Sequence, residues 1–145
     1  MEVYTIGFTE KSAQEFFERL KKAKVRRLMD VRLRNVSQLA GFSKRDDLCY
    51  FLREICGMEY VHEPLLAPSA EILDAYKKSK GSWEEYERLF RQLMEEREIE
   101  KYLSPADFET PTVLLCSEAT PENCHRRLVL EYLQEHWGGL EIRHL

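Results

Sequence analysis

The sequence predicts an α/β fold: a single three-layer domain with a mostly parallel sheet of about five strands flanked by helices. Short β-rich runs alternate with amphipathic helical segments in the order β-α-β-α-β-α-α-β-α-β. This alternation is typical of a parallel sheet with helices on its faces. The run TPTVLLC at 110–116 is almost continuously apolar, as a strand buried on both faces should be.

The first half of the chain predicts two strands and two helices. The run EVYTIG, which Gly7 closes, is the first strand, and the capping-box pattern SAQE at Ser12 begins a helix. The second strand is VRRLMDV, with Asp30 at its end. After an aperiodic loop, SKRD predicts that Ser43 caps another helix, and Gly57 suits the end of that helix.

The second half continues the alternation. MEYVHEP is a third strand, and the pattern from Ser69 to about Glu100 is helical, with a break at SKGS and a longer segment from Trp83. The apolar run TPTVLLC is the fourth strand. We expect a helix from Pro121, with Thr120 as its N-cap, and a last strand in GGLEIRHL.

Composition narrows the class of protein. The chain has 145 residues, 43% hydrophobic and 33% charged, which predicts one soluble domain over 1–145. The net charge of −4 argues against a protein that coats nucleic acid by bulk electrostatics. We expect no membrane partner, because no apolar run approaches the roughly 20 residues of a span. The N-terminus lacks the pattern of a secretory signal, which predicts a cytoplasmic protein in which the four cysteines form no disulfide framework.

Carboxylates follow two of the predicted strands. Ligands of α/β sheets bind beyond the carboxyl ends of the strands, and Asp30 and Glu118 lie there. Glu118 is a candidate general acid or base, with pairing to a nearby arginine as the alternative. Asp30 is a candidate catalytic group or, equally, a structural partner of Arg32, because alternate residues of a strand share a face.

Cys124, His125 and Arg126 fall in the first turn of a predicted helix. Helix N-termini favour anions and activate thiols, so Arg126 is a candidate phosphate ligand, and Cys124 and His125 are candidate catalytic residues. Packing is the alternative for Cys124, and Cys116 is expected in the core. We expect no metal, because the spacing lacks C-x₂₋₄-C and adjacent helical residues point about 100° apart.

The loop RLRNVSQLAGFSKR carries cations around one aromatic residue. Interleaved cations and aromatics suit a phosphate-bearing chain or a stacked base, with a solvated loop as the alternative. The candidate substrate-binding residues of this loop are Arg32, Arg34, Phe42 and Lys44.

Several motifs resemble those of the DUF488 family, named for its unknown function. They are YTIG, DVR, GFSK, EYVHEP and the stretch LLCSEATPENCHRRL, which is similar to the family's C-x-E…C-H-R signature. The resemblance covers nearly the whole chain and implies a fold and a residue cluster, but no reaction. One position departs: Phe8 stands where relatives commonly have His, so no essential imidazole is expected there.

The leading functional hypothesis is an enzyme, a hydrolase or transferase, that acts on a nucleotide or nucleic acid. Arginines and a helix start would hold phosphate, while carboxylates act at an N-glycosidic or phosphoester bond. One alternative is a cysteine-dependent enzyme with Cys124 as nucleophile and Cys116 as its resolving partner, which needs the two sulfur atoms within disulfide reach. The other is a non-enzymatic nucleic-acid-binding module. We expect no cofactor, and the oligomeric state stays open.

Overall fold

The centre of the protein is a parallel β-sheet. The computed structural model describes residues 1–36, 41–77, 81–117 and 124–145. The five strands lie in the order β3-β2-β4-β1-β5, and every pair is parallel. Their bounds are β1 Glu2–Gly7, β2 Arg27–Asp30, β3 Glu59–His62, β4 Thr112–Cys116 and β5 Glu141–His144. The predicted α/β fold with about five strands is confirmed.

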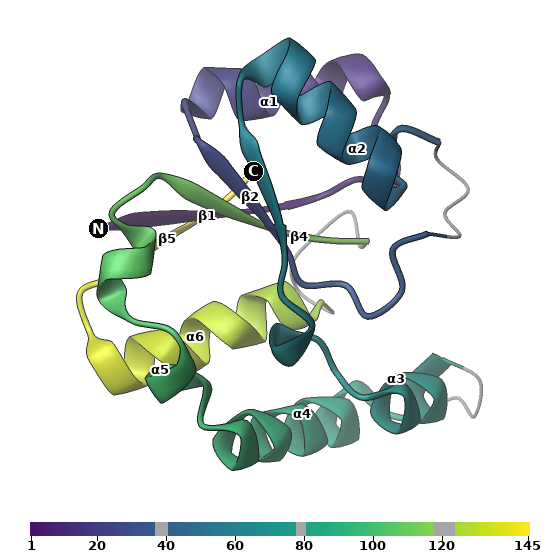
Figure 1. The fold of residues 1–145 in the computed structure, drawn as a ribbon. Coiled ribbons are helices and arrows are strands. Elements are labelled where there is room, and N and C mark those ends of the chain that lie inside the picture. The colour runs from purple at the N-terminus through teal and green to yellow at the C-terminus, as the bar shows by residue number, and fades with distance from the viewer. Residues whose placement is uncertain (37–40, 78–80, 118–123) are drawn as a thin grey trace.

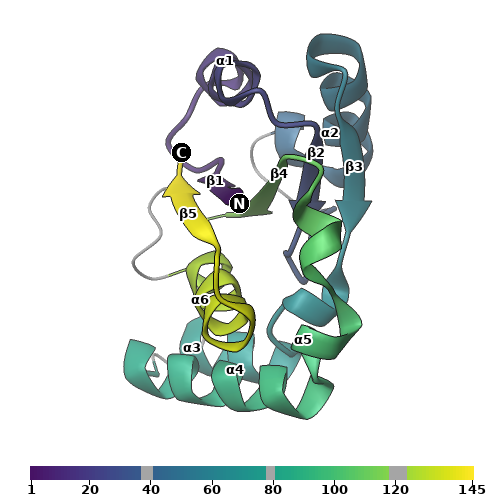
Figure 2. The same ribbon diagram turned by 90° about the vertical axis from the view of Figure 1, so that its left-hand side faces the viewer.

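Helices cover both faces of this sheet, which gives three layers (Figures 1 and 2). On one face lie α1 (Ala13–Ala23) and α2 (Arg45–Phe51), which a π-helical turn, Leu52–Cys56, extends. On the other lie α3 (Ala70–Lys77), α4 (Trp83–Arg97), α5 (Ile99–Tyr102) and α6 (His125–Trp137). Short 3₁₀ turns span Gly41–Ser43, Pro64–Leu66 and Pro105–Phe108. Among the described helices, none has the length and apolar character needed to cross a bilayer.

The path of the chain reverses at β4. From β1 the chain passes through α1 to β2 and through α2 to β3; it then returns through the opposite helical layer to β4 and β5. Strand β4 therefore lies between β1 and β2, and its connection leaves on the other face. Ligands of α/β proteins bind beyond the strands at such a reversal. We call the strand ends there, Gly7–Thr9, Asp30–Arg32 and Cys116–Ser117, the switch edge.

Alternate residues of β4 pack against opposite layers, as a pleated strand dictates. Val113 and Leu115 belong to the core cluster formed with α1 and α2, whereas Leu114 and Cys116 belong to the cluster formed with α4 and α6. All four side chains are fully buried. The alternation decides which helical layer each residue of the switch edge faces.

Helix termini agree with the sequence in part. Ser12 caps α1 through a hydrogen bond from the Glu15 backbone N–H (3.1 Å), as predicted. Gly57 ends the π-helical turn with a φ of 63°, a conformation that glycine adopts without strain. The prediction for Ser43 is wrong, because Ser43 is buried in the preceding 3₁₀ turn and Lys44 is the N-cap of α2.

The start of α6 also differs from the prediction. Thr120 and Pro121 lie outside the described residues, but Cys124 has an extended backbone (φ −135°, ψ 138°). A helix that began at Pro121 would already be helical at this position, so α6 begins at His125 with Cys124 as its N-cap. Cys124, His125 and Arg126 therefore form the entrance to the helix.

Candidate functional site

A buried carboxylate organises the end of β2. Asp30 is fully buried and accepts two parallel hydrogen bonds from Arg32, Nε to Oδ1 and Nη2 to Oδ2, both 2.8 Å. The Tyr60 hydroxyl donates to Oδ2 at 2.5 Å and the Asn35 amide donates to the same atom at 3.3 Å. We call Asp30, Arg32, Asn35 and Tyr60 the Arg32 network. The structure thus pairs Asp30 with Arg32, as their i, i+2 spacing predicts.

The surroundings of Asp30 keep it ionised. Burial alone would raise the pKa of this carboxyl, but the hydrogen bonds and charge of Arg32, with the hydroxyl of Tyr60, outweigh burial and hold the pKa below its usual range. Burial and the hydrogen bond to Asp30 raise the pKa of Tyr60. A fully engaged carboxylate with a lowered pKa is suited to fixing Arg32 in place rather than to transferring a proton.

Arg32 has an unused donor. Its side chain is 2% exposed, and its guanidinium lies over the ring of Phe8, 5.5 Å from the ring centroid. Within the described part of the chain, Nη1 of Arg32 has no hydrogen-bond partner. His62 donates from Nε2 to the Arg32 carbonyl oxygen (2.8 Å), which holds the backbone as well. A buried guanidinium N–H without an acceptor is costly, so this atom is able to donate to an anionic or polar group that reaches it.

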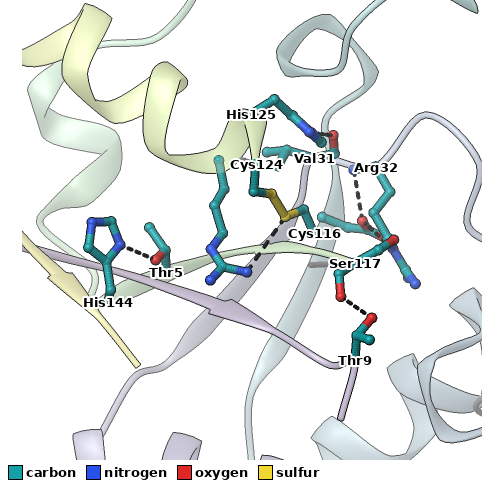
Figure 3. The surroundings of a disulfide bond; sticks show 11 residues. Thr5, Thr9, Val31, Arg32, Cys116, Ser117, Cys124, His125 and His144 are labelled. Atoms are coloured by element: carbon teal, nitrogen blue, oxygen red, sulfur yellow. Dashed lines mark hydrogen bonds and ion pairs between the residues drawn. A yellow bond between two sulfur atoms is a disulfide. The ribbon is translucent and has the colours of Figure 1, made fainter. Parts of the chain in front are cut away.

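A second group gathers where β4 ends and α6 begins (Figure 3). The structure joins Cys116 and Cys124 in a disulfide, with both residues buried and their Cα atoms 7.3 Å apart. Arg126, which is 1% exposed, donates from Nη1 to the sulfur atom of Cys116 at 3.6 Å. We call Cys116, Cys124, His125 and Arg126 the sulfur cluster. The expectation that the cysteines form no disulfide is wrong for this pair, whereas the thiol alternative places the same two sulfur atoms within disulfide reach.

His125 connects the two groups. Its Nε2 lies 2.6 Å from the carbonyl oxygen of Val31, as Figure 3 shows. Because a carbonyl only accepts hydrogen bonds, Nε2 carries the proton. The ring of Phe90 meets the imidazole edge-on, with the centroids 5.7 Å apart. The start of α6 is thereby fastened to the residue that precedes Arg32.

The two groups face opposite helical layers. Val31 and Cys116 belong to the core on the α6 side, whereas Phe8 belongs to the core on the α1 side and Tyr60 packs against it. Between the groups, Thr9 ties β1 to β4, because its hydroxyl and its backbone N–H both donate to the carbonyl of Ser117. At the switch edge, the Arg32 guanidinium therefore lies on one face of the sheet and the disulfide of Cys116 and Cys124 lies on the other.

The remaining predicted residues lie elsewhere. Arg34 is exposed and pairs with Asp74 of α3, Nη1 to Oδ1, at 3.2 Å. Lys44 is exposed at the N-cap of α2. Phe42 is half-buried and packs against two phenylalanines of α1, with ring centroids 5.4 and 5.8 Å away. Glu118, the predicted acid or base, lies outside the described residues.

Sequence reasoning missed several contributors to the switch edge: Phe8, Asn35, Tyr60 and His62. Tyr60 and His62 alternate along β3, whose pairing sets His62 opposite Asp30. The alternating polar residues in EYVH were a usable signal, but only once β3 was known to pair with β2. Asn35 lies in the loop after β2 and offered no periodicity that could have marked it.

Comparison with known proteins agrees with the motifs. Residues 12–133 match the family described as "Domain of unknown function DUF488". The chain belongs to this DUF488 family. The matched segment contains both the Arg32 network and the sulfur cluster, so both groups lie within the family domain. No curated protein and no solved structure matches the chain.

Proposed function

We propose that this DUF488 protein is an enzyme that binds the phosphate of a nucleotide or nucleic acid at the switch edge, with Arg32 as the anion ligand. The observation that carries the proposal is the Nη1 atom of Arg32. It is buried, belongs to a fixed cation, and has no partner among the described residues. Guanidinium groups bind phosphate oxygens well, because their donors are planar and always charged.

The position of Arg32 supports a substrate site rather than a structural ion pair alone. Asp30 already binds Nε and Nη2, so the third nitrogen is not needed for that pair. The residue lies at the chain reversal where α/β proteins bind ligands. Arg126 and the start of α6 would meet a second anionic or polar part of the same substrate from the other face of β4.

The proposed reaction is hydrolysis or transfer at an N-glycosidic or phosphoester bond. Glu118 is proposed as the acid or base, on the strength of its place after β4 in the sequence. Asp30 is proposed as a positioning residue, because its oxygens are engaged by Arg32 and its pKa is lowered. Phe42, the aromatic residue of the loop, gives the least support to a nucleotide as the substrate, because its ring packs against α1.

The first test measures ligand binding to Arg32. Inorganic phosphate, nucleotides and short DNA and RNA oligonucleotides are titrated by calorimetry into wild type, Arg32→Lys and Arg34→Lys. We expect Arg32→Lys to weaken binding of the active ligand about tenfold or more, or about 1.4 kcal/mol. Arg34→Lys should bind as wild type does, because Arg34 is exposed and paired with Asp74. Equal affinity in all three proteins would remove Arg32 as the anion ligand.

A further variant separates binding from folding. Tyr60→Phe weakens the Arg32 network but keeps the guanidinium, so it should bind the ligand even where its melting temperature falls. Once a ligand is known, product formation by Glu118→Gln tests the proposed acid or base. Turnover at the wild-type rate in Glu118→Gln would exclude that role.

Thiol chemistry is a second candidate, because the sulfur atoms of Cys116 and Cys124 are joined. In the reduced protein, the thiolate of Cys124 would attack a substrate disulfide, expel one thiolate and form a mixed disulfide that Cys116 resolves. It ranks second because both residues are buried. Cys116→Ser, incubated with oxidised glutathione, should accumulate a glutathione adduct on Cys124 that mass spectrometry detects; if no adduct forms, the candidate fails.

A further inference from the structure

We propose that Cys116, Cys124 and His125, once the cysteines are reduced, bind one divalent metal ion of the zinc class at the switch edge. The two sulfur atoms and a ring nitrogen of His125 all lie within 4.8 Å of one another. This inference goes beyond the anion site of Arg32 and does not depend on it.

The backbone at the start of α6 explains how the three ligands converge. The sequence argued against a metal, because adjacent residues inside a helix point about 100° apart. Cys124, however, is the N-cap of α6 and has an extended backbone (φ −135°, ψ 138°). Its side chain therefore does not follow the helical spiral, and it meets Cys116 at the end of β4 while His125 begins the helix.

The spacing of the two cysteines leaves room for an ion. Their Cα atoms are 7.3 Å apart, whereas disulfides usually span about 4.4–6.8 Å between Cα atoms. Two thiolates on a tetrahedral zinc ion, with Zn–S bonds of about 2.3 Å, lie roughly 3.8 Å apart. A backbone that separates the cysteines this widely accommodates thiolates that share a metal.

The hydrogen bond of His125 suits a metal ligand. Nε2 donates to the Val31 carbonyl at 2.6 Å, so in the neutral ring the lone pair is on Nδ1. Metal-binding histidines commonly donate their other ring nitrogen to a carbonyl or carboxylate, which fixes the tautomer and the orientation of the ring. Val31 would be that outer partner here.

Charge at the site also favours a metal held by thiolates. The Arg126 guanidinium donates to the sulfur of Cys116 at 3.6 Å, and the N-terminus of α6 favours negative charge. Both stabilise thiolates over thiols. Two thiolates buried together would repel each other, and a divalent ion neutralises them.

The chemistry of the ligands selects the metal. Thiolate and imidazole bind zinc and related transition metals, whereas magnesium and calcium take oxygen ligands. The described residues of the group supply three ligands. Zinc sites with three protein ligands hold water or substrate in the fourth position and act in catalysis. The proposed ion would therefore be available to chemistry at the switch edge.

Reduction must precede binding, because the structure holds the two cysteines as a disulfide. A phosphine reductant supplies two electrons while water supplies the two protons, which gives two thiols and a phosphine oxide. One divalent ion then displaces both thiol protons and forms two metal–sulfur bonds.

The test is a cobalt(II) titration of the full chain, reduced with a phosphine and stripped of metal with a chelator. We expect cobalt–thiolate charge-transfer and ligand-field absorption bands that saturate at one equivalent and disappear when zinc is added. Cys124→Ser and His125→Gln should weaken binding by more than the about 10- to 100-fold that loss of an outer-shell partner costs.

Matched variants separate the proposed ligands from the remaining cysteines and histidines. Cys49 and Cys56 are the cysteines outside the disulfide, so Cys49→Ser/Cys56→Ser should bind cobalt as wild type does. His136→Gln controls for His125→Gln, because His136 is on the same helix and also hydrogen-bonds a carbonyl. Each variant is checked by circular dichroism. Absence of bands in the reduced wild type, or unchanged bands in folded Cys124→Ser, would overturn the proposal.

Discussion

The ends of β2 and β4 lie side by side in the sheet, yet they are built from opposite kinds of chemistry. At the end of β2, Asp30 and Arg32 are held by hydrogen bonds between charged groups. At the end of β4, Cys116 and Cys124 are held by sulfur chemistry. The one group should therefore respond to protons, and the other to oxidants and metals. Perturbing each in turn separates structural support from reactivity.

The largest effect is expected from Asp30→Asn, which leaves Arg32 buried without its counter-charge. Breaking a buried ion pair from one side costs about 3–5 kcal/mol. Urea unfolding at neutral pH should show a loss of this size, whereas Asp74→Asn, in the exposed pair with Arg34, serves as the control. A loss as small as that of the control would mean that the Arg32 network does not stabilise the fold.

Lowering the pH should reduce the difference in the free energy of unfolding between wild type and Asp30→Asn. The folded-state pKa of Asp30 is below its usual value, which is about 3.9 in an unfolded chain. The stability from its ionised form is thus present above about pH 4 and is lost as the pH falls through the folded pKa. Urea unfolding of both proteins over this acid range checks the sign, and a constant difference would contradict it.

Reduction of the disulfide in the sulfur cluster should lower the free energy of unfolding by less than Asp30→Asn does. The cysteines are eight residues apart, and closing a loop of that length is worth about 2.5 kcal/mol by loop entropy. With a chelator present, a phosphine reductant should lower the free energy of unfolding by this amount in wild type and in Cys49→Ser/Cys56→Ser. Cys116→Ser/Cys124→Ser should be unaffected, and a response from that variant would show that the effect comes from elsewhere.

Tyr60→Phe should lower the free energy of unfolding by about 1.5–3 kcal/mol, the range for hydrogen bonds to charged groups. The variant removes the 2.5 Å bond to Asp30 and the 3.2 Å bond that the Tyr60 hydroxyl accepts from the Asn35 amide. Tyr50→Phe is the matched control, because Tyr50 is 53% exposed. Chemical denaturation of the two proteins gives the comparison, and equal stabilities would mean that Tyr60 does not contribute to the Arg32 network.

The smallest effect belongs to Arg34→Gln. Its pair with Asp74 is exposed, and such pairs are worth about 0–1 kcal/mol. Thermal melts should place this variant within a few degrees of wild type. A drop as large as that of Asp30→Asn would mean that Arg34 itself is part of the Arg32 network.

Local patterns carried most of the fold. The apolar run that ends at Cys116 predicted the buried strand β4, and the i, i+2 spacing of Asp30 and Arg32 predicted their shared face. Non-local features could not be predicted, because strand order depends on contacts between segments that are far apart in the sequence. Tyr60 reaches Asp30 only since β3 pairs with β2. The Thr-Pro pair also suggested an early start for α6, where the extended backbone of Cys124 sets a later one.

The alternation of β4 has a consequence for how its chemistry can change. Even-numbered positions from Leu114 to Cys116 address the α6 layer, and odd-numbered positions address α1 and α2. The two faces of β4 can therefore change independently of each other. A substitution changes the side chains on one face and leaves the other face intact. Insertion of a single residue would instead move each following side chain to the opposite face and turn the sulfur of Cys116 away from Cys124.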